Sequence, residues 1–478
     1  MKTSRIALTL ACAAMVASCG GGGTSGNAIG NTPTPTPSST PTPSPTSGQC
    51  SLESRQDWVL DQLDEWYLFP TLLDISVNKA DHSTVQSYID ALVAPARAQS
   101  RDRFFTYITS IEEEEAFFNQ GASAGFGVRL GYDSGARRAF VIEAFEGAPA
   151  LGQNIDRGAE LLEIGTSEAT LQTVNSLMAV DGPFGVIDAL GPDTAGTTRV
   201  IRLRDASGVE RTVTLTKEEY DLDPVSDRYG FTIINDGGKQ VGYINLRTFI
   251  STAEPDLIAG YQSLLSAGVT ELVIDLRYNG GGLIWVAELM GDLMGRGRAG
   301  QVFDRITFRD SKSSNNSTYF FDPRPESIQP TKIAFITTRG TASASEMVIN
   351  SMQPYLPDTD IALIGTNTYG KPVGQIAQDQ ASCDDRLRIV ALRTENADGN
   401  ADYYTGLAST VPNRCSAFDD ISAQFGDPSE NMLSVALDFL RGGAAACTPF
   451  SATTQGVGRE FLQRENPNTA QRNVPGIF

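Results

Sequence analysis

The chain has 478 residues, which is too many for one ordinary domain, so we expect two or three folded units. Its hydrophobic content of 40% is ample for a packed core. The formal net charge of −20 argues against nucleic acid or an anionic lipid surface as a partner.

The N-terminus has the pattern of an export signal. Lys2 and Arg5 precede an apolar run that is too short to span a bilayer. The run ends in Val-Ala-Ser-Cys, and small residues before a cysteine resemble a bacterial lipoprotein signal. We therefore expect residues 1–18 to be removed and Cys19 to be acylated. An ordinary secretory signal with a chance cysteine is the alternative.

Residues 19–49 are rich in Gly, Ser, Thr and Pro and cannot bury enough surface to fold. They predict a tether between a lipid anchor and a folded domain. The expected location is the bacterial cell envelope, facing the periplasm or the cell surface. Gly20, rather than Asp, follows the cysteine and favours the outer membrane.

Three kinds of pattern follow along the chain. Residues 50–118 show helical spacing of apolar residues and predict a helical domain. Residues 119–218 contain short β-type runs separated by turn signals. Residues 225–445 alternate strand and helix patterns and predict a layered α/β core, and residues 446–478 are expected to form a C-terminal tail. The fold class is therefore multidomain α/β.

Four cysteines remain beyond residue 19, namely Cys50, Cys383, Cys415 and Cys447. In an exported protein an even number indicates two disulfides, for which three connectivities exist. We expect Cys383–Cys415 and Cys50–Cys447. No metal site is expected, because the cysteines are scattered and His82 is the only histidine.

The shortage of histidine excludes most familiar hydrolase chemistry. A Ser-His-Asp or Cys-His enzyme needs a histidine beside its nucleophile, and His82 lies far away in the helical part. The sequence has no HExxH motif and no phosphate-binding GxxxxGK[ST] loop. A buried lysine can act as the base instead, because a low-dielectric site disfavours the ammonium form.

Two segments supply such a pair. Ser343, in RGTASASE, lies between a predicted strand and a predicted helix, where helix N–H groups are available for an oxyanion. Lys371, in TYGKPVGQ, follows an apolar strand and lies between glycines. Taken alone, the serine is a helix cap and the lysine is a turn residue. Their order within one α/β core favours catalysis.

TASASE, YGKPVGQ and DLRYNGGG together resemble the carboxyl-terminal processing peptidases, a family of Ser/Lys serine peptidases. The resemblance covers about residues 100–440. It implies a helical segment, a PDZ domain and a ClpP/crotonase-like peptidase core, and it implies no cofactor. Ser343 would be the nucleophile, Lys371 the general base and Gln375 the residue that orients the lysine.

The resemblance also implies further roles. The backbone N–H groups of Ala344 and Gly281 would bind the oxyanion, and Glu346 would lie near the site. In the PDZ domain, Gly125, Phe126, Gly127 and Val128 would receive the terminus of a substrate chain by their N–H groups. Pro372 stands where the family has the second glycine of Gly-Lys-Gly.

The sequence thus predicts a membrane-anchored serine endopeptidase that cleaves protein or peptide substrates through an acyl-enzyme. Two alternatives stay open. One is an envelope lipoprotein that has lost catalysis and acts as a PDZ-containing binding module. The other is a hydrolase of small esters or cell-wall peptides that uses the same dyad.

Overall fold

A computed structural model describes residues 48–451 and 459–478, which belong to the unit Pro45–Phe478. The signal, Cys19 and nearly all of the tether lie outside the described residues. Within the described residues, no helix is both long and apolar enough to cross a bilayer.

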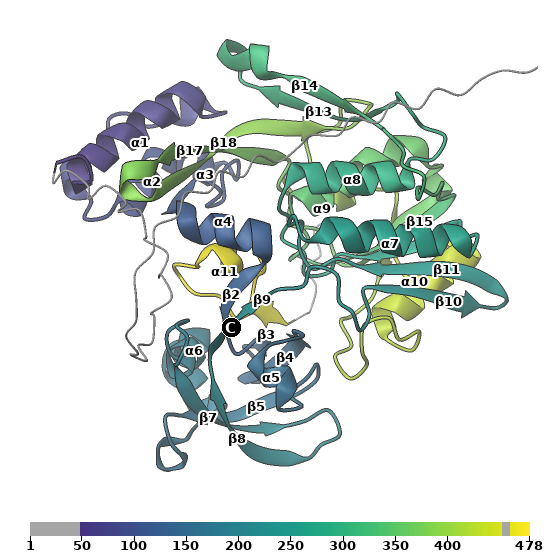
Figure 1. The fold of residues 1–478 in the computed structure, drawn as a ribbon, viewed down its shortest axis with the longest axis horizontal. Coiled ribbons are helices and arrows are strands. Elements are labelled where there is room, and N and C mark those ends of the chain that lie inside the picture. The colour runs from purple at the N-terminus through teal and green to yellow at the C-terminus, as the bar shows by residue number, and fades with distance from the viewer. Residues whose placement is uncertain (1–47, 452–458) are drawn as a thin grey trace, which may run out of the picture. The chain divides into compact units, whose positions relative to one another are not determined.

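The centre of the structure is a six-stranded sheet in the order β10-β11-β12-β15-β16-β19 (Figure 1). Its strands are parallel except for the antiparallel β10–β11 hairpin. Their bounds are β10 (Phe231–Asp236), β11 (Lys239–Asn245), β12 (Glu271–Asp275), β15 (Lys332–Thr337), β16 (Ile361–Gly365) and β19 (Asn413–Ser416).

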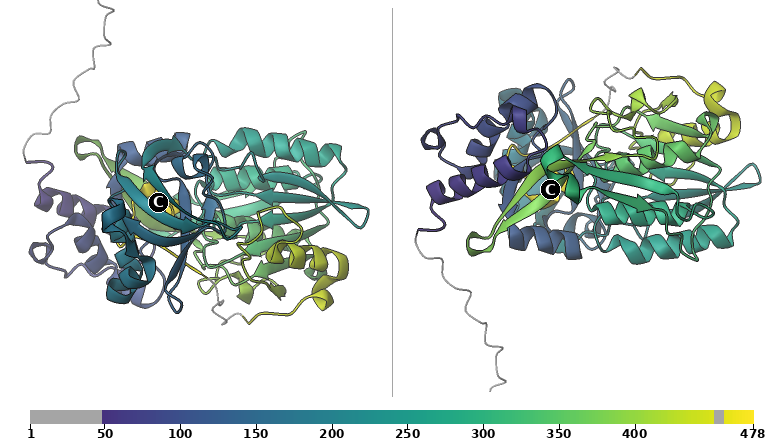
Figure 2. Two further views of the ribbon diagram at one scale, coloured as in Figure 1. Left: turned by 90° about the horizontal axis from the view of Figure 1, so that it is seen from below. Right: turned by 90° about the horizontal axis from the view of Figure 1, so that it is seen from above.

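Helices cover both faces of this sheet, because its strands are apolar on both sides. Leu272 and Ile274 pack toward α7 (Ala253–Ser266), α8 (Ile284–Met294) and α9 (Ala344–Met352). Val273, between them, packs with α10 (Asn431–Gly442) on the opposite face. Both views of Figure 2 show this helix–sheet–helix layering. The predicted α/β core is confirmed.

A second, antiparallel sheet joins distant parts of the chain. The long strand β18 pairs with β1, β13 and β17, and β14 pairs with β13. Their bounds are β1 (Tyr107–Ser110), β13 (Val302–Phe308), β14 (Ser317–Phe320), β17 (Val373–Gln380) and β18 (Asp385–Glu395). Because β1 comes from the N-terminal helical part, that part is tied to the core through backbone hydrogen bonds.

The N-terminal helices pack on this second sheet. Leu387 and Ile389 of β18 share one apolar cluster with side chains of α1 to α3. The helices are α1 (Leu52–Trp66), α2 (Val85–Leu92), α3 (Ala94–Ala98) and α4 (Ile111–Gln120). These helices lie almost entirely within residues 50–118, where the sequence predicts a helical domain.

Residues 122–221 form a β-rich unit whose entering and leaving strands, β2 and β9, pair with each other. Inside it, β3, β4, β5, β7 and β8 form a sheet with α5 and α6 packed against it. The bounds are β2 (Ala122–Gly125), β3 (Val128–Asp133), β4 (Arg138–Ala144), α5 (Pro149–Gly152), β5 (Glu160–Gly165), β6 (Gln172–Thr173), α6 (Val174–Leu190), β7 (Thr198–Arg204), β8 (Glu210–Thr216) and β9 (Glu218–Asp221).

The expected disulfide pairing is wrong. The bonds are Cys50–Cys383 and Cys415–Cys447, with Cα–Cα distances of 5.5 and 5.3 Å. Cys383 lies at the turn between β17 and β18, where α1 begins nearby, whereas Cys415 lies in β19 of the other sheet. Spacing along the chain could not decide the pairing, because Cys383 and Cys447 each lie 32 residues from Cys415, and Cys383 belongs to the other sheet.

Peptide mapping without reduction should therefore recover Cys50 linked to Cys383 and Cys415 linked to Cys447. Replacing Cys50 and Cys383 by Ser should lower the free energy of unfolding by about 2–4 kcal/mol, because the denatured chain is no longer constrained. The double Cys415→Ser and Cys447→Ser variant is the matched comparison. Recovery of a Cys383–Cys415 peptide would contradict the assignment.

Candidate active site

Ser343 lies on the turn between β15 and α9, at the carboxyl edge of the central sheet. Its backbone has φ +55° and ψ −116°, a conformation that is costly for a residue with a side chain. Two hydrogen bonds to the carbonyl of Asn279 stabilise this turn. Ala342 N and Ser345 Oγ are the donors, at 3.0 Å each. Ser345 is buried within the first turn of α9, as expected. These hydrogen bonds on both sides of Ser343 fix the position of its backbone.

The buried carboxylate of Glu346 joins the serine turn to the lysine loop. It accepts hydrogen bonds from Ser343 N at 3.1 Å and from Lys371 N at 2.7 Å. It also accepts from Gly370 N and from Thr368 Oγ1, at 2.6 Å each. Burial raises the pKa of Glu346, and these four hydrogen bonds oppose the rise. One side chain thus positions the backbone of both candidate catalytic residues.

Lys371 follows β16 and immediately precedes β17. Its Nζ donates to Gln375 Oε1 at 2.9 Å and lies 4.6 Å from the ring centroid of Phe105. Gln375 in turn donates its Nε2 to the carbonyl of Phe105. Burial lowers the pKa of Lys371 to about 8. The expected contact between Lys371 and Gln375 is present, and the lysine has the environment that a general base requires.

Sequence reasoning missed the contribution of the N-terminal part. Arg103 donates to the carbonyls of Tyr369 and Gly370, and its guanidinium lies 4.1 Å from the Tyr369 ring centroid. Phe105, as described above, packs on Lys371 and anchors Gln375. The signal for these residues is weak, because arginines and aromatics in SRDRFFTY (100–107) are more than 260 positions away from the loop that they support.

The glycine run 280–282 lies directly against the serine. A Cβ on Gly281 would lie 2.7 Å from Ser343 Cβ and 3.0 Å from Ala344 N, so only glycine allows this approach. The N–H of Gly281, however, donates to Asn279 Oδ1 at 2.9 Å. For Gly281 to serve as an oxyanion donor, this bond must break. Ala344 has the expected position at the start of α9.

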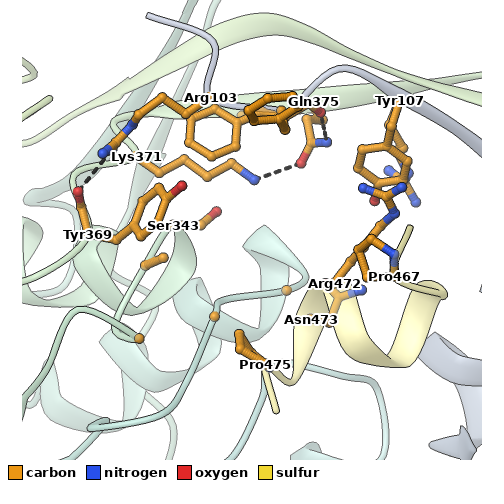
Figure 3. A pocket seen from close by; sticks show the side chains of 18 of the residues that line it. Arg103, Tyr107, Ser343, Tyr369, Lys371, Gln375, Pro467, Arg472, Asn473 and Pro475 are labelled. Carbon is orange, nitrogen blue, oxygen red and sulfur yellow. Dashed lines mark hydrogen bonds between the residues drawn. The ribbon is translucent and has the colours of Figure 1, made fainter. Parts of the chain in front are cut away.

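Ser343, Lys371 and Gln375 line one cavity of about 560 Å³ (Figure 3). Its walls come from the N-terminal part, the core and residues 461–475, which include Pro467 and Arg472. The apolar lining of Phe105, Ile284 and Trp285, among others, suits a peptide side chain. Among the described residues, no cluster of three or more His, Cys, Asp or Glu could hold a metal ion.

The other predicted site residues, Gly125 to Val128, belong to the β-rich unit and do not line this cavity. They gather around the main chain of Phe478. Gly127 N and Val128 N donate to Phe478 O at 2.9 and 3.2 Å, and a Cβ on Gly125 would lie 2.5 Å from Phe478 C. The loop therefore holds the main chain of Phe478.

The structure is a layered α/β core in which Ser343 and Lys371 line one cavity. Residues 240–408 match the model of peptidase family S41. The C-terminal processing peptidase from chloroplasts of Tetradesmus obliquus is 28% identical over 273 residues, which cover 54% of this chain and about half (53%) of that protein. The carboxyl-terminal-processing protease of Synechocystis sp. is 23% identical over 335 residues, covering 68% and 70% of the two chains.

A solved structure, an S41 protease candidate from Bacteroides fragilis, has a TM-score of 0.62 and 23% identity. It covers 80% of this chain and 97% of that chain, and the likeness concerns the fold. The resemblance found in the motifs is confirmed. Residues 240–408 thus match the S41 family, and the chain is similar in sequence to carboxyl-terminal processing peptidases.

Glu346→Gln should reduce kcat/KM for an unstructured protein substrate by about 10- to 100-fold, because the amide NH₂ would face N–H donors and displace both loops. The pH at which activity is half-maximal should also fall, because the Glu346 charge raises the pKa of Lys371. Glu168→Gln, at an exposed position, is the control. Parental activity and an unchanged pH profile in Glu346→Gln would contradict the positioning role.

Proposed function

We propose that this protein is a serine endopeptidase that uses Ser343 and Lys371 as a catalytic dyad. The observation that carries the proposal is the half-buried amine of Lys371, which Gln375 holds in the cavity that Ser343 also lines. The kinship with the S41 peptidases supports it. The chain has no histidine near Ser343 that could serve as the base instead.

In the proposed mechanism, neutral Lys371 takes the proton of Ser343 Oγ while Oγ attacks the scissile carbonyl carbon. The tetrahedral oxyanion rests on the N–H groups of Ala344 and, after it leaves Asn279, Gly281. The Lys371 ammonium then gives its proton to the leaving amine as the C–N bond breaks. Water, activated by the same lysine, attacks the acyl-enzyme and releases the product with a free Ser343.

The proposed substrate is a protein or peptide that the β-rich unit engages near its C-terminus. Gly125, Phe126, Gly127 and Val128 would act as the carboxylate-binding loop of a PDZ-like domain at residues 119–218. The signal at residues 1–18, acylation of Cys19 and the tether would place the enzyme on the bacterial envelope, with the outer membrane favoured. These parts rest on the sequence pattern.

Ser343→Ala and Lys371→Ala should each lower the cleavage rate of an unfolded protein by at least about 10³-fold, because each removes one half of the dyad. Ser266→Ala and Lys239→Ala, which lie outside the cavity, are the matched controls. Mass spectrometry should detect an acylated Ser343 in the parental protein. Parental rates in either dyad variant would refute the mechanism.

The same assay separates the two alternatives. A parental chain that binds peptides but forms no acyl-enzyme would be the binding module. A chain that hydrolyses small esters but no unstructured protein would be a hydrolase of another substrate class.

Activity should rise with pH through about 8, because only the neutral amine of Lys371 can accept the serine proton. With a pKa of about 8, about one tenth of the lysine is neutral at pH 7, against roughly 0.03% for an unperturbed lysine. The measurement is kcat/KM between pH 6 and pH 9.5. A profile that is flat, or that falls as pH rises from 7 to 8.5, would exclude Lys371 as the base.

A further inference from the structure

Residues 459–478, within the expected C-terminal tail, contain a strand and a helix. β20 (Glu460–Phe461) pairs with β3, and α11 (Thr469–Asn473) packs on α4. Residues 476–478 then run along β3, where the chain end is marked in Figure 1. The segment thus contacts the β-rich unit, the N-terminal part and the candidate active site. We name residues 459–478 the return segment.

The end of the return segment fills the loop that was predicted to receive a substrate. Phe478 N donates to Val128 O at 2.9 Å, which completes the pair of bonds that Gly127 N and Val128 N make to Phe478 O. One register step along, Leu130 N donates to Gly476 O at 2.7 Å. This is strand addition to the edge of β3, and it satisfies the main-chain groups that an extended ligand would need.

The side chain of Phe478 lies in an apolar pocket. It is 2% exposed and belongs to the core cluster of the β-rich unit, together with Phe126, Val128 and Leu215. Burying one aromatic ring in such a pocket is worth a few kcal/mol. Phe478 therefore combines main-chain pairing to β3 with a buried apolar side chain.

Polar contacts hold the rest of the return segment in place. Asp193 of the β-rich unit accepts from Lys217, at 2.7 Å, and from two side chains of the segment, Arg464 and Gln471. Gln471 Nε2 also donates to Ile477 O at 3.2 Å. The side chains of Asp193 and Lys217 are buried. If the segment moved away, Asp193 would lose two of its hydrogen-bond donors.

The middle of the return segment lies against the candidate active site. Pro467, Arg472, Asn473 and Pro475 line the cavity that contains Ser343 (Figure 3). The carbonyl of Asn473 would lie 2.8 Å from a Cβ on Gly280, so the segment packs directly on the glycine run next to Ser343.

We propose that the return segment is an intramolecular ligand of its own chain, which fills the peptide groove and restricts the active site until a substrate terminus displaces it. The regulatory part rests on the proposed function. A tethered ligand acts at an effective concentration on the order of 1 mM. If the free peptide binds with a Kd of about 10 μM, the segment weakens substrate binding by roughly 100-fold.

The first experiment measures groove occupancy without catalysis. A fluorescein-labelled peptide of residues 470–478 is titrated into the full chain carrying Ser343→Ala, with and without Phe478→Asp. The charged residue should not stay in the apolar pocket, so the peptide should bind the double variant at least 10-fold more tightly. Asn466→Asp adds the same charge at an exposed position of the segment and should leave binding weak.

Phe478→Ala, which removes the ring without adding charge, should give an intermediate affinity, and thermal melting checks that each variant is folded. Equal peptide affinity in the presence and absence of Phe478→Asp would overturn the proposal. The absence of binding to every variant would overturn it as well, because the groove would then not take this sequence.

The second experiment measures cleavage of an unstructured protein by chains that retain Ser343. Phe478→Asp should raise kcat/KM by at least about threefold over the parental chain, whereas Asn466→Asp should not. An equal or lower value in Phe478→Asp would overturn the inhibitory role. If no chain cleaves, the proposed function fails, whereas the peptide titration still decides whether the segment is the groove's ligand.

Discussion

The proposed chemistry depends on keeping one lysine amine out of water. Burial is the dominant influence on Lys371 and lowers its pKa, whereas the nearby charges of Asp102 and Glu346 raise it and Arg388 lowers it. The apolar wall comes largely from Phe105, and the polar partner is Gln375. A surface lysine would be almost entirely protonated at neutral pH and could not accept a proton. The surroundings of Lys371 lower its pKa enough for the neutral amine to act as a base.

This enclosure explains why the N-terminal part is attached so firmly. β1 pairs with β18, and α1 to α3 pack on the same sheet. Gln375 lies in β17, which is another neighbour of β18 in that sheet. The Cys50–Cys383 bond fixes the beginning of α1 to the β17–β18 turn. The loop that includes Phe105 is therefore held at both ends against Lys371. A separate helical domain on a flexible link would not give the amine a constant environment.

The parts of the site that the sequence predicted are the ones that lie in continuous segments. Ser343 occupies a strand-to-helix turn and Lys371 follows the next strand, so both could be placed from the alternation of apolar runs. Gln375 is four residues from Lys371, and the two do meet. The core strands and the helices were found for the same reason, since burial on both faces leaves long apolar runs.

Contacts between distant segments were not predictable in this way. Phe105 anchors Gln375 through its main-chain carbonyl, which every residue type has, so no side-chain pattern marks it. The disulfides depend on which sheet each cysteine belongs to, and sequence distance does not give that. The ordered path of residues 459–478 depends on pairing with β3, some 330 positions earlier. The sequence of a two-residue strand such as β20 does not differ from that of a tail, and only the pairing with β3 distinguishes them.

The return segment connects these observations, because it pairs with β3 and also forms part of the wall of the active-site cavity. In the proposed scheme, a substrate terminus that takes the place of Phe478 removes the anchor at one end of the segment, and α11 then loses part of what holds it on the glycine run. The two sites are coupled without any rearrangement of the sheets. Coupling of this kind is reciprocal, so a ligand held in the active-site cavity should also weaken the segment's hold on the groove. Asn473 of the segment packs on Gly280, and the next residue, Gly281, has its N–H bonded to Asn279.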